Sequence, residues 1–234
     1  LAIFQQDLVS FGGVGHGFMC HAALTEKHLG EHHHVSRLVL HPDQLTHEPP
    51  VILDLFPCYA ELDGHGGDHA VGSIRPKSGA DKDGTWSFDI RSRPLKPVVS
   101  HGGDGIIDMG DAGGDSYYYS YTRTEATGRV ETPEGSFEVR GQAWMDHQWG
   151  DFDINAFKGW DWWSVQLDDD WELMLFEFRD WEGVVVSRAG SIVDPQGRAT
   201  ELSGLGAFTI SALREWESPH TDGVYPLDWD GAIP

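Results

Sequence analysis

The stretch SYYYSYTRTEATGRVETPEGSFEVRGQAWMDHQW occupies residues 116–149 and decides the expected fold. Aromatic and β-branched residues dominate it, and turn residues interrupt it at Thr127-Gly128 and again at 133–135. This pattern predicts a strand, a turn, a second strand, a second turn and a third strand. The segment therefore indicates antiparallel β-structure.

Other segments repeat this alternation of strands and turns. Residues 84–94 alternate apolar and polar side chains, residues 162–180 predict a hairpin closed at 168–170, and residues 183–202 predict a strand followed by an Asp-Pro-Gln-Gly turn. The best helical candidate is CHAALTEKHLGEHHH, at 20–34. Short strands separated by turns predict an all-β fold, an antiparallel sandwich or barrel.

The composition is that of a strongly acidic globular protein. Its 234 residues are 39% hydrophobic and 12% aromatic, which is enough to bury a core. Thirty-eight acidic residues against 16 basic ones give a net charge of −22. A field of that sign repels phosphate backbones and anionic lipid. We therefore expect no nucleic acid partner and no strong binding to anionic membranes; an oligomer stays open.

Two cysteines, Cys20 and Cys58, do not make a disulfide framework. They could form one bridge, but we expect two buried thiols. No apolar run approaches the length of a membrane span, and no signal peptide is visible. We expect a soluble protein, cytoplasmic rather than secreted. The region 60–115 is rich in Gly and Asp and predicts loops, where binding residues often lie.

The candidate site lies in a tryptophan-rich segment. Alternate residues of a strand share a face. Within 144–149, one face is expected to carry Trp144, Asp146 and Gln148, and the other Met145, His147 and Trp149. Along 160–167, one face is expected to carry Trp160, Trp162, Ser164 and Gln166, and the other Asp161, Trp163, Val165 and Leu167. On the return strand the two faces are Met174, Phe176 and Phe178, and Leu173, Leu175, Glu177 and Arg179.

Core packing accounts for some of these aromatic residues, since Trp and Phe commonly fill barrel interiors. The combination of these aromatic rings with His147 and nearby carboxylates indicates a chemical role beyond core packing. Indole faces stabilise cations, by about 0.5–2 kcal/mol each. A carboxylic acid among apolar groups has a raised pKa and can donate a proton near neutrality. Together these groups suit acid-initiated chemistry on an alkene.

Other chemistries have weaker support. The chain has no Gly-x-Ser-x-Gly elbow and no Gly-rich nucleotide loop. Of the three histidines at 32–34, only His32 and His34 can share a strand face, and no third ligand is evident, so no metal is predicted. Glycosidase chemistry stays open, because Trp side chains also stack on sugars.

Several motifs resemble the AttH/CrtC family, lipocalin-like proteins that include carotenoid 1,2-hydratase. The specific block is GQAWMDHQWGDFD with GWDWWSVQLDDDWELMLFEFR, within 141–179. FMCHAALTE at 18–26, SYYYSYTR at 116–123 and GVYPLDW at 223–229 are similar to further family motifs. The resemblance implies two lipocalin-like β-barrel halves, which we place at 1–152 and 153–234. It also implies an incomplete second half and a chain truncated at both ends.

The resemblance implies a cofactor-independent hydratase or cyclase that acts on an isoprenoid or polyene double bond. His147 and Trp149 match the family's His-x-Trp pair. The family's acid falls near Glu177, with Asp161 and Asp146 as rivals. The residues expected to line the substrate pocket are Trp149, Trp160, Trp162, Tyr118, Tyr119 and Phe176. The alternatives are a non-catalytic carrier of a lipophilic ligand and a Diels–Alder-type pericyclic catalyst.

Overall fold

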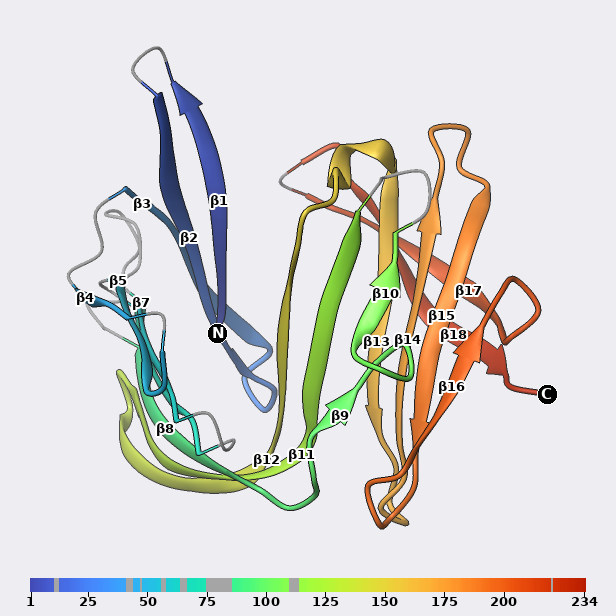
Figure 1. The fold of residues 1–234 in the computed structure, drawn as a ribbon. Coiled ribbons are helices and arrows are strands. Elements are labelled where there is room, and N and C mark those ends of the chain that lie inside the picture. Colours follow the sequence, from blue (N-terminus) through green and yellow to red (C-terminus); the bar gives the residue numbers. More distant parts are fainter. Residues whose placement is uncertain are drawn as a thin grey trace. The chain divides into compact units, whose positions relative to one another are not determined.

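A computed structural model describes residues 1–10, 13–40, 44–46, 48–55, 58–63, 67–74, 86–109, 114–219 and 221–234. The described chain is built from strands, with one short 3-10 helix, η2 (Ile154–Ala156). All paired strands run antiparallel, so the predicted all-β fold is confirmed (Figure 1). None of the described residues forms a helix with the length and apolar character that a membrane span requires.

The strands before the long central hairpin are β1 (Ala2–Ser10), β2 (Gly13–Glu26), β3 (Glu31–Val39), β4 (Gln44–Leu45), β5 (Val51–Leu55), β6 (Cys58–Leu62), β7 (His69–Ile74), β8 (Trp86–Pro94), β9 (Val99–Ser100) and β10 (Ile106–Asp108). The central hairpin is β11 (Asp115–Thr132) and β12 (Gly135–Gly150). The remaining strands are β13 (Gly159–Gln166), β14 (Glu172–Arg179), β15 (Val185–Val193), β16 (Ala199–Ser203), β17 (Thr209–Glu217) and β18 (Val224–Ala232).

The chain divides into two compact units that are discontinuous in sequence. Unit 1 comprises Leu1–Leu95 with Arg123–Ala143, and unit 2 comprises Lys96–Thr122 with Trp144–Pro234. The strands β11 and β12 each contribute to both units. The predicted boundary at 152/153 separates two barrel halves. The two compact units do not test that boundary, so it stays a prediction.

The helical candidate at 20–34 is wrong, because these residues form the end of β2, a turn and the start of β3. Glu26 lies opposite Glu31, and Leu29 N donates to Glu26 O in the turn. Gly30 has a φ of 68°, which favours glycine. Ala22 and Leu24, two residues apart, both pack in the core. This period of two is that of a strand and not of a helix.

A disulfide joins Cys20 of β2 to Cys58 of β6, so the expectation of two buried thiols is wrong. The two Cα atoms lie 6.6 Å apart, within the range that a disulfide bridges. Both residues belong to the core of unit 1, where Phe18, Leu55 and Trp86 are also buried. The packing of β2 against β6 brings together two cysteines 38 positions apart, which the sequence pattern does not show.

Residues 116–149 form one long hairpin rather than three strands. The predicted turn at Thr127-Gly128 is wrong, because β11 continues through both residues. Gly128 instead lies where β8 approaches closely: a Cβ there would stand 2.0 Å from the carbonyl oxygen of Asp89. The predicted turn at 133–135 is confirmed, since β11 ends at Thr132 and β12 begins at Gly135.

Unit 2 contains the four-stranded sheet β13–β16, whose hairpins match the predictions. Trp162 lies opposite Phe176, and Asp161 lies opposite Glu177, so the expected faces of β13 and β14 are confirmed. The turn at 168–170 closes this hairpin, and Leu167 N donates to Trp171 O. The core of this unit comprises Ile107, Met109, Tyr118, Met174, Phe176 and Phe178.

The described parts of the Gly- and Asp-rich region 60–115 contain strands as well as the predicted loops. They include β7 to β10 and the end of β6, with a turn at 101–104 between β9 and β10. The segment KSGADKDG, at 77–84, lies outside the described residues. One buried residue of this region, His101, takes part in the polar network of unit 2.

Candidate functional site

Asp146 is the centre of a hydrogen-bonded group on one face of the β11–β12 hairpin in unit 2. Its Oδ1 accepts hydrogen bonds from Tyr118 Oη at 2.9 Å, from Trp144 Nε1 at 2.8 Å, and from Ser120 Oγ. These donors lie on alternate positions of two paired strands, as the period of two requires. Gln148 continues the same face and donates to Ser116 Oγ at 2.7 Å.

The Asp146 carboxyl group combines a clamped oxygen with an available one. Within the described part of the chain, its hydrogen bonds all go to Oδ1, which leaves Oδ2 without a partner. Asp146 is exposed as a residue, yet the atoms packed around its carboxyl desolvate it. This desolvation raises the pKa of Asp146 above its ordinary value, against the opposing effect of the three hydrogen bonds.

Two indole rings are joined to this carboxyl group, Trp144 by a direct hydrogen bond and Trp162 through Tyr118. Trp144 and Trp162 meet edge to face, with ring centroids 6.5 Å apart. Trp162 Nε1 also donates to Tyr118 Oη at 3.1 Å, so β13 is tied to the same polar group. Tyr118 is buried, and burial with the nearby Asp146 charge raises the pKa of its hydroxyl, which therefore stays protonated. Trp162 is 41% exposed and leaves part of its ring open to a ligand.

His147 lies on the opposite face of β12 with a different set of partners. Its Nδ1 hydrogen-bonds to Tyr119 Oη at 3.0 Å, and its ring centroid lies 4.8 Å from that of Trp149. Trp149 stacks on Tyr117 at 5.5 Å and is 47% exposed. Desolvation lowers the pKa of His147, which favours the neutral ring. The sequence-predicted pair is adjacent, but Asp146 does not share its face.

Glu177 and Asp161 form a cluster with arginines on the β13–β14 hairpin. Arg179 Nη1 hydrogen-bonds to Asp161 Oδ2 and lies 3.5 Å from Glu177 Oε1. Arg188 Nε donates to Glu177 Oε2 at 3.0 Å. Carboxylates whose oxygens are held by guanidinium groups are engaged as ion pairs. This arrangement suits a structural role more than proton donation.

The other predicted pocket residues differ in their surroundings. Phe176 is buried in the core of unit 2, where it packs edge to face on Phe178. Trp160 is 54% exposed, so it offers a largely open ring. Tyr118 and Tyr119 lie on opposite faces of β11, with Asp146 and His147 respectively. The structure therefore separates the predicted set into three groups, around Asp146, around His147 and around Glu177.

Sequence reasoning missed His101, which is fully buried beside the Asp146 group. Its Nε2 lies 2.8 Å from Ser120 Oγ and its Nδ1 lies 2.9 Å from Ser191 Oγ. Burial lowers the pKa of His101 to about 4, so the ring is neutral at neutral pH. The residue stands in the sequence SHGGDG, whose glycines indicated a loop, and no pattern marked it as buried.

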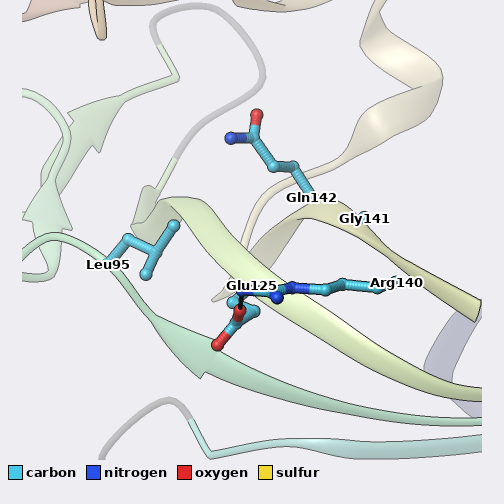
Figure 2. Close-up of a pocket in the computed structure, with 5 residues that line it drawn as sticks. All are labelled: Leu95, Glu125, Arg140, Gly141 and Gln142. Atoms are coloured by element: carbon cyan, nitrogen blue, oxygen red, sulfur yellow. Dashed lines mark hydrogen bonds and ion pairs between the residues drawn. The ribbon is translucent and has the colours of Figure 1, made fainter.

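Unit 1 contains pockets away from the predicted site residues. One pocket has a volume of about 270 Å³. Figure 2 shows its lining residues, Leu95, Glu125, Arg140, Gly141 and Gln142. Glu125 accepts hydrogen bonds there from Arg140 and, at 2.8 Å, from Arg93. A second pocket, of about 450 Å³, has His21, His32 and His34 in its lining. Neither pocket includes Asp146 or His147.

The histidines at 32–34 face both sides of β3, as predicted. The rings of His32 and His34 stack with centroids 5.9 Å apart. The ring of His33 instead packs on Trp86, and its Nε2 lies 3.3 Å from Glu31 Oε2 and 3.8 Å from Glu26 Oε1. Glu26, Glu31 and His33 offer three ligand atoms close enough to hold a cation.

Comparison with solved structures shows this fold in distant proteins. A Nitrosomonas europaea protein described as AttH has a TM-score of 0.78 and 21% identity, over 93% of this chain and 66% of that one. Kievitone hydratase of Nectria haematococca has a TM-score of 0.69 and 17% identity, over 99% of this chain and 67% of that one. This chain therefore spans about two thirds of the length of either protein.

These likenesses establish the fold, and the sequence itself establishes the family. Comparison with curated proteins gives no match. The sequence does match the family described as AttH-like over residues 6–234, nearly its whole length. The family predicted from the tryptophan-rich block is thus confirmed, and the chain belongs to the AttH-like family.

Proposed function

We propose that the protein is a cofactor-independent enzyme that protonates a carbon–carbon double bond of an isoprenoid or polyene. Asp146 is the acid, and hydration or cyclisation follows from the carbocation. The observation that carries the proposal is the Asp146 carboxyl group, with three donors on Oδ1, an Oδ2 without a partner among the described residues, and two indoles joined to the same polar group. The fold is shared with a protein named a hydratase, and this likeness also supports the proposal.

The hydrogen bonds of Asp146 fit the role of a general acid. Desolvation favours the neutral carboxyl group, which carries the proton. Because Oδ1 accepts three hydrogen bonds, we assign the proton to Oδ2, the oxygen without a partner among the described residues. After transfer, the same three donors stabilise the carboxylate that remains. The donors thus lower the energy of the charged product of the step.

The chemical step is a proton transfer from Oδ2 to one alkene carbon. The π electrons form the new C–H bond, and the other alkene carbon becomes a cation. The faces of Trp144 and Trp162 stabilise that cation through their quadrupoles. Water then adds and loses a proton to give an alcohol, or an internal double bond adds to give a ring and a second cation, which loses a proton or takes up water. The proton that leaves passes to solvent, and Asp146 must take up another proton before the next turnover.

A carrier protein and a pericyclic catalyst make different use of such a site. A carrier needs apolar rings but no protonated carboxyl group. A pericyclic catalyst uses shape and hydrogen bonds and transfers no proton to carbon. The hydrogen-bonded acid of raised pKa supports proton transfer over either alternative.

The test is incubation in D₂O with geraniol, farnesol, lycopene and a prenylated phenol, followed by mass spectrometry. Protonation places deuterium on a product carbon, and Asp146→Asn removes that product. A ring-closed product without carbon-bound deuterium would instead indicate a pericyclic catalyst. Binding of a probe without turnover, together with unaltered binding by the Asp146→Asn protein, would favour the carrier. Lipids extracted from the purified protein would direct the choice of further probes.

A further inference from the structure

A line of hydrogen-bonded side chains leads from Asp146 through the interior of unit 2. Ser120 Oγ donates to Asp146 Oδ1, and His101 Nε2 lies 2.8 Å from that Oγ. On the far side of the ring, His101 Nδ1 lies 2.9 Å from Ser191 Oγ. Ser191 Oγ in turn lies 3.0 and 3.1 Å from the two carboxyl oxygens of Glu201. Two carboxyl groups thus terminate a continuous line of exchangeable protons.

The middle of this line is closed to solvent. Ser120, His101 and Ser191 are each 0% exposed. The ring of Tyr118 packs against the imidazole with centroids 4.4 Å apart, and its hydroxyl stays protonated. A neutral imidazole has one N–H donor and one acceptor nitrogen, so His101 can pass a proton on without ever carrying charge.

The line needs one proton in addition to those of the two serine hydroxyls and the neutral imidazole. Four hydrogen bonds join the five groups, and each needs one proton. The two serine hydroxyls and the neutral His101 supply three. The fourth must come from one of the terminal carboxyl groups. A proton on Glu201 orients all four bonds toward Asp146, and a proton on Asp146 Oδ1 orients all four toward Glu201.

We propose that these side chains form a proton relay that resupplies Asp146 from Glu201. The proposal rests on the proposed function, because Asp146 needs a resupply only if it gives up its proton. Ser120, His101 and Ser191 are positioning residues, which act on the substrate only through Asp146.

The relay step is balanced. After Oδ2 of Asp146 has given its proton to the alkene, Oδ1 of the carboxylate takes the proton of Ser120. Ser120 takes the Nε2 proton of His101, and Nδ1 of His101 takes the proton of Ser191. Ser191 takes the carboxyl proton of Glu201, which becomes a carboxylate. The imidazole changes tautomer from Nε2–H to Nδ1–H, and no buried group is left charged.

Glu201 is suited to the outer end of the relay. It is half-buried, so it exchanges protons with water more readily than the residues behind it. Desolvation raises the pKa of its carboxyl group, which favours the protonated form that the relay requires. Its Oε2 also accepts from Gly102 N at 3.0 Å, which holds the group toward Ser191.

The direct test follows the tautomer of His101 by ¹⁵N NMR of the full chain, from acid to alkaline pH. In the wild type, loss of the Glu201 proton while Asp146 is still protonated should convert Nε2–H to Nδ1–H. In Glu201→Gln, the amide N–H donates permanently to Ser191 and should hold His101 as Nε2–H at every pH. Ser116→Ala is the control, since Ser116 is equally buried on the same face of β11 but bonds to Gln148; it should behave as the wild type.

The same tautomer at every pH in both the wild type and Glu201→Gln would overturn the relay, as would an imidazolium at neutral pH. A second readout uses any probe that the wild type turns over. Ser191→Ala should lower steady-state kcat by about tenfold or more while leaving kcat/KM and the rate of the first turnover unchanged, whereas Ser116→Ala should change none of these. Unchanged kcat in Ser191→Ala would also overturn the relay. If the wild type turns over no probe, the proposed function fails, and the NMR result still decides whether the relay exists.

Discussion

Asp146 and His147 are neighbours in sequence, but their side chains lie on opposite faces of β12. Asp146 accepts from Tyr118, whereas His147 bonds to Tyr119, the next residue of β11. The two residues therefore serve separate groups of partners, although the tryptophan-rich motif contains both. This separation decides which substitutions should affect proton donation.

Asp146→Asn should reduce turnover by roughly 100-fold or more, because an amide has no acidic proton to donate. His147→Gln should have a much smaller effect, since it changes the other face. The measurement is the rate of deuterium incorporation into product carbon, with circular dichroism to confirm that both variants fold. A larger loss in His147→Gln than in Asp146→Asn would move the acid site to the face of His147 and Trp149.

Trp162→Phe should slow turnover by about tenfold, since it removes the N–H donor to Tyr118 and weakens a cation–π contact of about 1 kcal/mol. Trp160→Phe is the matched control. Trp160 lies on the same face of β13, two residues away, and 54% of it is exposed. Comparison of kcat for the two variants on one probe checks the idea, and equal effects would contradict a specific role for Trp162.

The alternation of apolar and polar residues predicted the strands and most of their faces. The register of Trp162 with Phe176 and of Asp161 with Glu177 follows from the period of two and the turn at 168–170. Gly128 shows what a local sequence pattern cannot predict. A Thr-Gly pair is typical of a turn, but here the glycine accommodates the backbone of β8, a neighbour that the local sequence does not identify.

The candidate site was predictable in residue type but not in grouping. The tryptophan-rich block indicated acids and indoles, and Asp146 with Trp162 fits that description. Which acid is ion-paired depends on Arg179 and Arg188, whose positions come from the pairing of β13, β14 and β15. His101 gave no signal, because its burial arises from tertiary packing.

The disulfide should stabilise unit 1, because it closes a loop between residues 38 positions apart. Replacing both Cys20 and Cys58 by Ser should lower the free energy of unfolding by about 2–4 kcal/mol. Urea unfolding, monitored by tryptophan fluorescence, gives this value with and without a reducing agent. The wild type under reducing conditions should approach the double variant, and a reductant effect on the double variant itself would argue against this source of stability.

Lys96 and Glu172 form a buried ion pair whose removal should be asymmetric. Lys96 Nζ donates to Glu172 Oε2 at 2.8 Å, and the two side chains are 5% and 0% exposed. Lys96→Met removes a buried cation from the Glu172 carboxylate and should destabilise by about 3–5 kcal/mol. The double variant with Glu172→Leu should recover part of that loss. Arg214→Met is the control, since Arg214 pairs with Asp228 on the surface and should lose nothing measurable.

His101 should make the protein sensitive to mild acid. Its pKa in the folded protein is about 4, against 6.5 in the unfolded chain, so only the unfolded state binds a proton between these values. Stability must therefore fall as pH drops from 6.5 toward 4, by about 3 kcal/mol at the lower limit.

His101→Gln keeps a hydrogen-bonding side chain but does not titrate, so its stability should fall less over the same range. Urea unfolding of both proteins at the two ends of this pH range measures the difference. Equal losses in the two proteins would show that other groups carry the acid sensitivity and that His101 binds protons as readily in the folded state as in the unfolded one.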